Sequence, residues 1–247
     1  MKPRPLILAH RGDSKTFAEN TMPAFESAFS VDADGLEIDV QLTRDGRIAV
    51  IHDETVDRVA DGKGWVGDRT YDELSVLNAA HHRPDLEACR IPLLEEVLEL
   101  IQGTDKVINI ELKDSVRLYP GLIEAAMAMV QKMGVQEQII YSSFNHYSMA
   151  RIKELDKDAV TGLLYSHPLY KPWKYAEAAE AGALHPDYRN LRIPGYMAAC
   201  RERGLMVNVW TVDGEKDILQ MLKADVDAII TNVPALALQL KQGQIGT

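Results

Sequence analysis

The chain has 247 residues, of which 46% are hydrophobic and 26% are charged, and its formal net charge is −10 at pH 7. This composition is ordinary for a soluble globular protein and excludes wholesale disorder, a collagen-like chain and a disulfide-rich miniprotein. The acidic balance argues against nonspecific nucleic-acid binding, which requires basic surface, but it does not exclude an anionic small substrate held by local positive charge.

Apolar runs of strand length alternate with amphipathic runs of helix length along the chain. The expected strands cover residues 6–10, 36–40, 107–112, 138–142, 160–165, 183–186, 206–212 and 228–231. The expected helices cover residues 22–29, 93–101, 122–132, 147–155, 173–181, 195–203, 216–222 and 236–240. Eight strand–helix units in this length predict a single (βα)8 TIM-barrel domain over residues 1–247. An open, doubly wound sheet is the alternative, but the GxGxxG match at residues 62–67 follows no convincing strand, so it does not fit a dinucleotide-binding fold.

One unit is irregular, because a long stretch separates the second expected strand from its helix. Asp45 and Gly46 stand there between two β-rich runs, which is a strong signal for a hairpin with a two-residue turn. A turn centred on these two residues places His52 opposite Asp39. A shift of one residue in the pairing still leaves His52 near residues 37–39 of the second strand. The polar, glycine-bearing residues 54–91 are expected to form an inserted lid or small subdomain over one end of the barrel.

Two carboxylates lie on the second expected strand, at Glu37 and Asp39. Residues two apart on a strand point to the same face, so both carboxylates lie opposite the apolar residues on either side of them. Carboxylates on the inner face of a buried strand are costly unless they are paired or bind a metal. The alternative is an exposed edge strand with solvated acids, which the apolar flanks disfavour.

A second acidic strand follows in the sequence NIELK, which carries Glu111 and Lys113. The carboxyl ends of parallel barrel strands meet at one mouth, so Glu111 is expected beside Glu37 and Asp39. Three carboxylates are hard oxygen ligands that suit Mg²⁺ or Ca²⁺, whereas a zinc site would more often contain several histidines. Taken alone, Glu111 and Lys113 would also suit a structural ion pair.

Two histidines are expected at the same mouth. His10 ends the first strand, and His52 ends the returning arm of the hairpin. A lone histidine is usually structural, but two histidines that converge on an acidic cluster can divide the work of a general base and a general acid. Arg11 offers a planar fork for phosphate oxygens, and Lys113 offers a point charge.

Other candidates carry less weight. Trp210 ends the seventh strand and faces the same mouth, either as core packing or as an apolar wall against a substrate carbon chain. His185 ends the sixth strand and is a candidate to support the site from behind. Cys89 and Cys200 lie in separate segments and form no disulfide framework, so both thiols are expected to be free.

Several motifs together resemble the glycerophosphodiester phosphodiesterase family. The similar segments are HRG at residues 10–12, AENT at residues 18–21, EIDVQLTRDG at residues 37–46 and HD at residues 52–53. They are followed in family order by IPLLEEVL, NIELK, YSSF, NVWTVD and DAIITNVP. The resemblance therefore covers nearly the whole chain.

The resemblance implies a barrel with a small insertion that uses a divalent metal to hydrolyse glycerophosphodiesters to glycerol 3-phosphate and an alcohol. The metal-ligand positions of the family fall on Glu37, Asp39 and Glu111, for one divalent cation, Mg²⁺ or Ca²⁺. The acid/base positions fall on His10 and His52, and the phosphate contacts fall on Arg11 and Lys113.

The chain departs from the family pattern at two positions. Ala18 replaces the proline of PENT, and Asn232 replaces the usual aspartate of the closing strand. Neither residue is expected to touch a metal ligand or an acid/base residue, so we expect both changes to leave activity intact. The Ala18 change is expected to loosen the loop that carries Glu19 and Asn20.

Three other functions fit parts of this pattern. The nearest is a phosphodiester lyase that stops at a cyclic phosphate. A second is a phosphoester-binding module without activity, which the presence of both histidines and all three acids disfavours. A third is an unrelated barrel such as an aldolase, with Lys113 as a Schiff-base lysine, but a lysine beside three acids should stay charged.

The N-terminal apolar run is too short for the core of a signal peptide, and no run reaches the length of a membrane span. We therefore expect a cytoplasmic protein whose partner is a small-molecule substrate, without nucleic acid and without stable membrane insertion. The sequence leaves the alcohol part of the substrate and the oligomeric state open.

Overall fold

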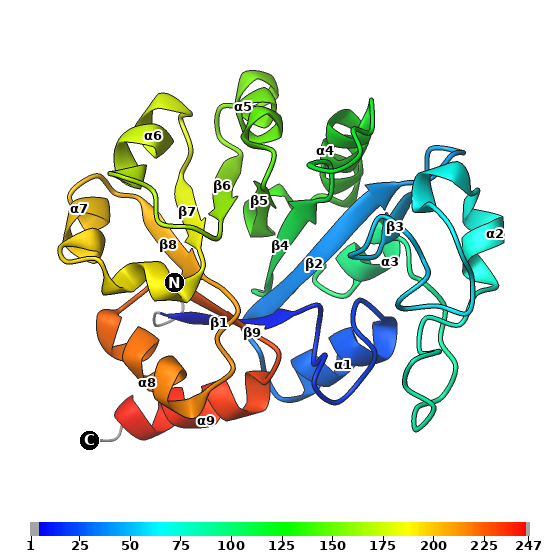
Figure 1. Cartoon of the computed structure of the whole chain (residues 1–247), viewed down its shortest axis with the longest axis horizontal. Helices are drawn as coiled ribbons and strands as arrows, with labels where there is room; N and C mark the ends of the chain where they lie inside the picture. Colours follow the sequence, from blue (N-terminus) through cyan, green and yellow to red (C-terminus); the bar gives the residue numbers. More distant parts are fainter. Residues whose placement is uncertain (1–4, 246–247) are drawn as a thin grey trace.

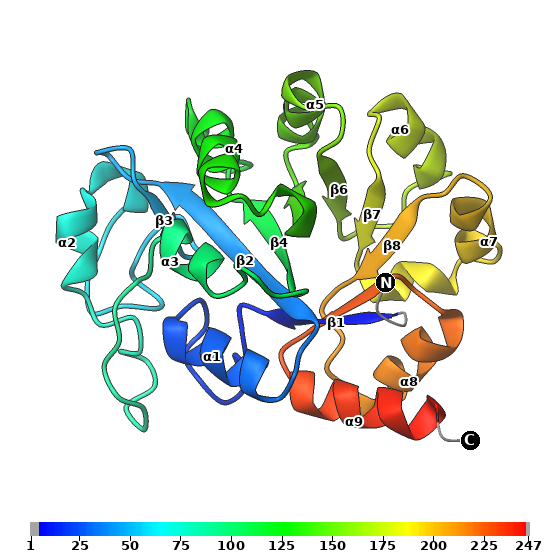
Figure 2. The same cartoon turned by 180° about the vertical axis from the view of Figure 1, so that it is seen from behind.

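The computed structural model describes residues 5–245 and shows a closed barrel (Figure 1). Within those residues, eight parallel strands pair in the order β1-β9-β8-β7-β6-β5-β4-β2, and β2 pairs with β1 to close the ring. The short strand β3 adds to β2 in the antiparallel direction. Helices surround the sheet, as Figures 1 and 2 show from opposite sides. The predicted (βα)8 barrel is confirmed.

The strands are β1 (Leu6–His10), β2 (Gly35–Leu42), β3 (Ile48–Val50), β4 (Val107–Leu112), β5 (Ile139–Ser143), β6 (Val160–Tyr165), β7 (Ala183–Pro186), β8 (Met206–Val209) and β9 (Ala228–Thr231). The helices are α1 (Met22–Ser30), α2 (Tyr71–Ser75), α3 (Leu94–Glu99), α4 (Leu122–Met133), α5 (His146–Leu155), α6 (Pro172–Ala178), α7 (Tyr196–Arg201), α8 (Glu215–Ala224) and α9 (Pro234–Ile245). Every predicted strand and helix is present, and most of their ends differ from the prediction by at most two residues. Across residues 5–245, no helix has both the length and the apolar character that a membrane span requires.

Two elements end three residues earlier than predicted. Helix α6 ends at Ala178 rather than at residue 181, because Glu180 adopts a left-handed φ of +51° that the helix cannot continue through. Strand β8 ends at Val209 rather than at residue 212, because Trp210 leaves the ladder and pairs only as an isolated bridge with Asp187.

The hairpin between β2 and β3 has a three-residue loop, and the predicted two-residue turn is wrong. The Thr43 N–H donates to the carbonyl four residues further on at 2.9 Å, and the Thr43 hydroxyl accepts the N–H of that same residue at 2.9 Å. Gly46 adopts a φ of +78°, which is typical of a three-residue loop that ends in a glycine bulge. The register therefore shifts by one residue, and Ile51 rather than His52 lies opposite Asp39, whose carbonyl accepts the Ile51 N–H at 2.9 Å.

Successive side chains of the barrel strands point alternately into two apolar clusters. Outward residues such as Ile7 and Ile229 belong to the large core between the sheet and the helices. Their neighbours Leu8 and Ile230 point inward and form a separate small cluster inside the barrel. The inner faces of β2 and β4 carry buried acidic and polar side chains instead, and the candidate site lies on them.

Residues 54–91 pack beside β2 and β3 (Figure 1). Buried side chains of this insertion, among them Val56 and Leu74, form a small apolar cluster with Ala49 and Ile51 of the hairpin. The insertion therefore shares its core with the hairpin arm that carries one of the two candidate histidines.

Candidate active site

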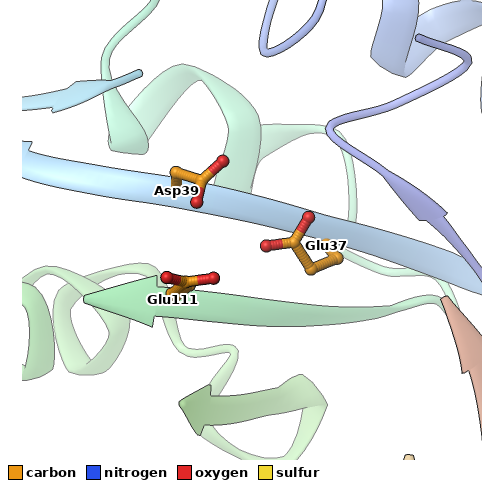
Figure 3. A group of neighbouring side chains, drawn as sticks. All are labelled: Glu37, Asp39 and Glu111. Carbon is orange, nitrogen blue, oxygen red and sulfur yellow. The ribbon is translucent and has the colours of Figure 1, made fainter. Parts of the chain in front are cut away.

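Three buried carboxylates meet at the mouth of the barrel, and we call them the acidic cluster: Glu37, Asp39 and Glu111. Strand β2 contributes the first two and β4 the third, and backbone pairing sets Asp39 beside Glu111. One oxygen of each carboxylate lies within 4.8 Å of the others. Figure 3 shows the carboxylates facing one another between the two strands. The structure thus brings together the three acids that the sequence analysis selected.

Burial opposes the ionisation of all three carboxyl groups of the acidic cluster. Burial and the nearby carboxylates Asp39 and Glu111 hold the pKa of Glu37 well above its usual value. Burial opposes ionisation of Asp39 too, but Arg11 and Lys113 outweigh it and lower the pKa of that carboxyl. Asp39 Oδ1 is buried and accepts no hydrogen bond from the described part of the chain. This set of hard oxygen donors, with one acceptor unused, fits a divalent cation of the Mg²⁺ or Ca²⁺ type.

Arg11 and Lys113 balance part of this negative charge. Arg11 Nε lies 3.2 Å from Asp39 Oδ2, and Lys113 Nζ lies 2.7 Å from Glu111 Oε1. Burial disfavours the charged form of Lys113, but Glu111 and Asp39 outweigh burial and raise its pKa. Lys113 is therefore an ammonium group, which argues against the neutral amine that a Schiff-base mechanism requires.

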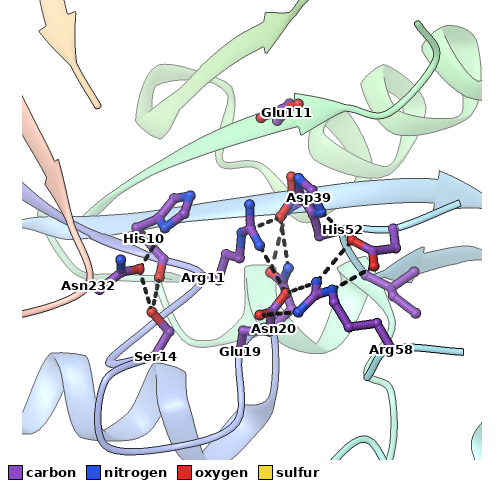
Figure 4. Close-up of polar contacts among 12 residues, drawn as sticks. His10, Arg11, Ser14, Glu19, Asn20, Asp39, His52, Arg58, Glu111 and Asn232 are labelled. Carbon is purple, nitrogen blue, oxygen red and sulfur yellow. Dashed lines mark hydrogen bonds and ion pairs between the residues drawn. The ribbon is translucent and has the colours of Figure 1, made fainter. Parts of the chain in front are cut away.

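His10 is held by Asn232, and the expectation that Asn232 touches neither of the two candidate histidines is wrong. The Asn232 side-chain nitrogen donates to Asp213 at 2.7 Å, so its oxygen accepts from His10 Nδ1 at 2.7 Å (Figure 4). His10 Nε2 is left as an acceptor and lies 3.8 Å from Glu37 Oε2. Burial, with a smaller effect of Arg11, lowers the pKa of His10 to about 4, so the ring is neutral near pH 7.

The loop after β1 reaches the acidic cluster through its AENT segment. Asn20 Nδ2 donates to Asp39 Oδ2 at 2.8 Å, and Glu19 Oε1 accepts from Arg11 Nη1 at 2.9 Å. Ala18, which precedes these residues, is buried. The segment therefore orients one acid of the cluster and the guanidinium beside it.

His52 belongs to a chain of polar contacts that begins in the insertion (Figure 4). His52 Nδ1 donates to Asp53 Oδ1 at 2.6 Å. Arg58 donates to both oxygens of Asp53, at 2.6 and 2.9 Å, and to both oxygens of Glu19, at 2.6 and 2.9 Å. Burial opposes ionisation of Asp53, but Arg58 and His52 outweigh it and lower its pKa to about 2. The Asp53 carboxylate therefore fixes the orientation of the His52 ring.

A pocket of about 90 Å³ lies at the mouth of the barrel, beside the acidic cluster. Its lining includes residues from both sides of the mouth: His10, Arg11, Glu37, His52, Asn109, Glu111 and Trp210. Trp210 Nε1 donates to the His185 carbonyl at 2.7 Å, and the Phe144 ring meets the indole edge-on with a centroid distance of 5.6 Å. His185 itself is fully buried, and its Nε2 accepts from Asn208 at 2.9 Å. It supports the wall through its main chain rather than facing the pocket.

Sequence reasoning gave no role to five polar residues of this site: Glu19, Asn20, Asp53, Arg58 and Asn232. The first three stand inside the AENT and HD motifs, so motif membership was the available signal. Asn232 drew notice only as a departure from the family pattern. Arg58 lies in an insertion without hydrophobic periodicity, and nothing local in the sequence indicates that it turns back to the site.

Comparison with known proteins finds a family for this arrangement. Residues 10–236 match the Glycerophosphoryl diester phosphodiesterase family. A glycerophosphodiester phosphodiesterase of Caldanaerobacter subterraneus is 44% identical over 238 residues, which cover 96% of this chain and 98% of that protein. The crystal structure of a glycerophosphodiester phosphodiesterase from Agrobacterium tumefaciens is similar with a TM-score of 0.84 and 27% identity, covering 97% of this chain and 100% of the other. An Oleispira antarctica phosphodiesterase, solved in complex with the product sn-glycerol-3-phosphate, is similar with a TM-score of 0.84 and 25% identity, covering 98% of this chain and 97% of the other. The chain therefore belongs to the glycerophosphoryl diester phosphodiesterase family.

Proposed function

We propose that the protein hydrolyses glycerophosphodiesters to glycerol 3-phosphate and an alcohol at the acidic cluster. The observation that carries the proposal is that two histidines, His10 and His52, line one pocket together with the buried acids Glu37 and Glu111. The name of the Caldanaerobacter relative and the product bound to the Oleispira enzyme support the same reaction.

We propose one divalent cation, Mg²⁺ or Ca²⁺, with ligands Glu37, Asp39 and Glu111. Three carboxylate oxygens within 4.8 Å of one another support this assignment, as does Asp39 Oδ1, which accepts no hydrogen bond within the described residues and lies 3.7 Å from Lys113 Nζ. When bound, such a cation supplies positive charge to the phosphate as negative charge develops there.

We assign Arg11 and Lys113 to the phosphate. A phosphodiester is a monoanion that becomes more negative toward the transition state, so fixed positive charge at the mouth lowers the barrier. The Arg11 guanidinium has five N–H donors in a planar fork, which allows it to hold Glu19 and Asp39 and still donate to a phosphate oxygen. Lys113 has three donors and one close partner, Glu111.

We assign His10 as the general base and His52 as the general acid. His10 Nε2 takes a proton from the attacking oxygen, which is water or the neighbouring glycerol hydroxyl. His52 gives a proton to the alkoxide that leaves when its bond to phosphorus breaks. Attack by water gives both products in one step, whereas attack by the hydroxyl gives a cyclic phosphate that water then opens. The neutral His10 ring supports its role as the base, and the Asp53 carboxylate, which accepts from His52 Nδ1, orients the ring of the proposed acid.

Further parts of the chain take supporting roles in this proposal. Trp210 is an apolar wall beside the substrate carbon chain, and residues 54–91 are a lid-like insertion within a single catalytic domain, residues 1–247. The small-molecule substrate is the only partner that we propose, and a cytoplasmic location stays a prediction of the sequence.

The proposal is tested by treating chelator-stripped protein with glycerophosphocholine and glycerophosphoethanolamine, with and without Mg²⁺ or Ca²⁺. Phosphorus NMR distinguishes the diester, glycerol 3-phosphate and a cyclic phosphate in one spectrum. We expect metal-dependent formation of glycerol 3-phosphate. An accumulating cyclic phosphate would indicate the lyase instead, and no turnover of either diester with either metal would contradict the proposed function.

A further inference from the structure

A second and larger cavity opens beside the pocket, along the segments that follow β5 and β6. We call it the aromatic groove, and its lining includes Phe144, His146, Leu164, Leu169, Tyr170 and Tyr175. Its volume is about 550 Å³, whereas the pocket beside the acidic cluster measures about 90 Å³. Small-molecule sites usually measure roughly 300–1,000 Å³, so the groove has the size of a ligand site and the pocket alone does not.

The aromatic groove adjoins the proposed catalytic pocket. Phe144 and Leu164 line both of them. The Phe144 ring also packs edge-on against Trp210, which belongs to the pocket wall. A diester whose phosphate lies at the acidic cluster has two organic arms, and the small pocket does not hold both. One arm must therefore extend past Phe144 and Leu164.

The glycerol arm suits the pocket better than the groove. Its free hydroxyls need hydrogen-bond partners, because burying a hydroxyl without one costs several kcal/mol. Asn109 lines the pocket, and its Oδ1 is a buried acceptor without a hydrogen-bond partner among the described residues. Arg11 adds N–H donors on the same wall. This leaves the alcohol arm for the groove.

The chemistry of the groove favours an uncharged, apolar group. Among the described residues that line it, none is a carboxylate, an ammonium or a guanidinium group. His146 Nε2 donates to the Leu164 carbonyl at 2.8 Å, and His146 Nδ1 accepts from the Tyr175 hydroxyl at 3.1 Å. Both ring nitrogens of His146 are therefore satisfied. Ser166 and His167 also line the groove and hydrogen-bond each other at 2.9 Å, and the rest of the lining presents mainly ring faces and aliphatic carbons to a ligand.

A cationic alcohol such as choline meets two obstacles in this groove. No carboxylate is available to pair with it. Tyr170 has the most exposed aromatic ring of the groove lining. The Lys171 ammonium already lies over the face of this ring, 5.0 Å from its centroid. A second cation on that ring would be repelled by the first.

We propose that the aromatic groove binds the alcohol arm of the diester and selects alkyl or aryl alcohols over cationic ones. The inference rests on the proposed function and names the class of glycerophosphodiester that the enzyme turns over best.

Three diesters with the same phosphate test the proposal: sn-glycero-3-phosphohexanol, sn-glycero-3-phosphoethanolamine and 1-hexanoyl-sn-glycero-3-phosphoethanolamine. Since a few methylene groups in an apolar pocket change kcat/KM by about tenfold or more, we expect at least a tenfold preference for the hexanol diester over the ethanolamine diester. Equal kcat/KM values for these two would overturn the proposal. A preference for the hexanoyl compound would also overturn it, because the acyl chain sits on the glycerol arm.

Exposed residues allow matched variants that leave the core intact. Tyr170 lines the groove and is 88% exposed, whereas Tyr147 lies on α5 outside its lining and is 89% exposed. The double variant L169S/Y170S should lower kcat/KM for the hexanol diester by about tenfold. Its kcat/KM for the ethanolamine diester should stay within about twofold of the wild-type value. The control Tyr147→Ser should change neither value. If the ethanolamine diester is cleaved and no variant alters the ranking, only this inference fails; if no diester is cleaved, the proposed function fails.

Discussion

Arg58 and Glu19 form a bidentate ion pair between the insertion and the loop after β1, with N···O distances of 2.6 and 2.9 Å. The same guanidinium donates to Asp53, which in turn accepts from His52. Glu19 accepts from Arg11, which lies against Asp39. One insertion residue thus links the two sides of the site.

This relationship predicts that Arg58 is a positioning residue. Arg58→Gln should lower kcat by about 10- to 100-fold, as is typical when a group that orients a site residue is removed. Added guanidinium ion should restore part of the activity, because it can occupy the space between Asp53 and Glu19. Arg83→Gln is the control, since Arg83 also lies in the insertion and bonds the Thr16 carbonyl but does not contact the site. Full activity of the Arg58 variant, or a loss without rescue in a folded protein, would contradict this role.

A substrate whose leaving group needs no proton distinguishes the proposed roles of His10 and His52. His10→Ala and His52→Ala should each lower turnover of an ethanolamine diester by about 10²- to 10⁴-fold. With a p-nitrophenyl diester, whose phenolate leaves without a proton, His52→Ala should regain most of its turnover and His10→Ala should not. The reverse pattern in steady-state rates would exchange the two roles.

Burial lowers the pKa of His10, and the hydrogen bond to Asn232 opposes this effect. Asn232→Asp places a carboxylate against His10 Nδ1, and a nearby negative charge raises the pKa of the ring. The acidic limb of the pH profile of kcat/KM should therefore move to higher pH, by about one unit or more. Ser14→Ala removes another hydrogen bond to the Asn232 oxygen without adding charge, and it should leave the limb in place. An unmoved limb in Asn232→Asp would remove His10 from the proton transfer that this limb reports.

The buried ring of His185 makes the free energy of unfolding depend on pH. Burial lowers the pKa of this fully buried ring from 6.5 to about 3, so the folded protein keeps it neutral while the unfolded chain takes up a proton below pH 6.5. The free energy of unfolding should therefore fall as the pH drops, by about 1.4 kcal/mol per unit below pH 6.5, or about 2 kcal/mol between pH 7.5 and 5. His185→Gln keeps an acceptor for Asn208 but does not titrate, so its loss between these two pH values should be smaller by about that amount. Equal losses in urea unfolding of the two proteins would contradict this.

Much of the fold was predictable because its elements are periodic. The strands alternate apolar and polar residues or are apolar throughout, and most of them are followed by an amphipathic helix. The acidic cluster was predictable for the same reason, since Glu37 and Asp39 share a strand face and Glu111 ends the next barrel strand. These inferences needed only the geometry of a strand and the rule that parallel strands end together.

The parts that could not be predicted depend on loops. The hairpin register was wrong because the Thr43 side chain and Gly46 stabilise a three-residue loop, which the Asp-Gly pair alone does not indicate. The contacts of Arg58 and Asn232 join residues far apart in sequence, so they exist only once the barrel and insertion are folded. The aromatic groove has the same origin, because irregular segments after β5 and β6 supply half of its lining.

The central claim is that the acidic cluster holds the cation on which turnover depends. The most direct measurement is the rate of glycerol 3-phosphate release as a function of Mg²⁺ or Ca²⁺ concentration, for the wild-type protein and for Glu111→Gln. Loss of one charged ligand should raise the half-activating cation concentration by about tenfold or more, because a carboxylate binds these hard cations far better than an amide. An unchanged activation curve with Glu111→Gln, or full activity of the stripped protein without added metal, would contradict the claim.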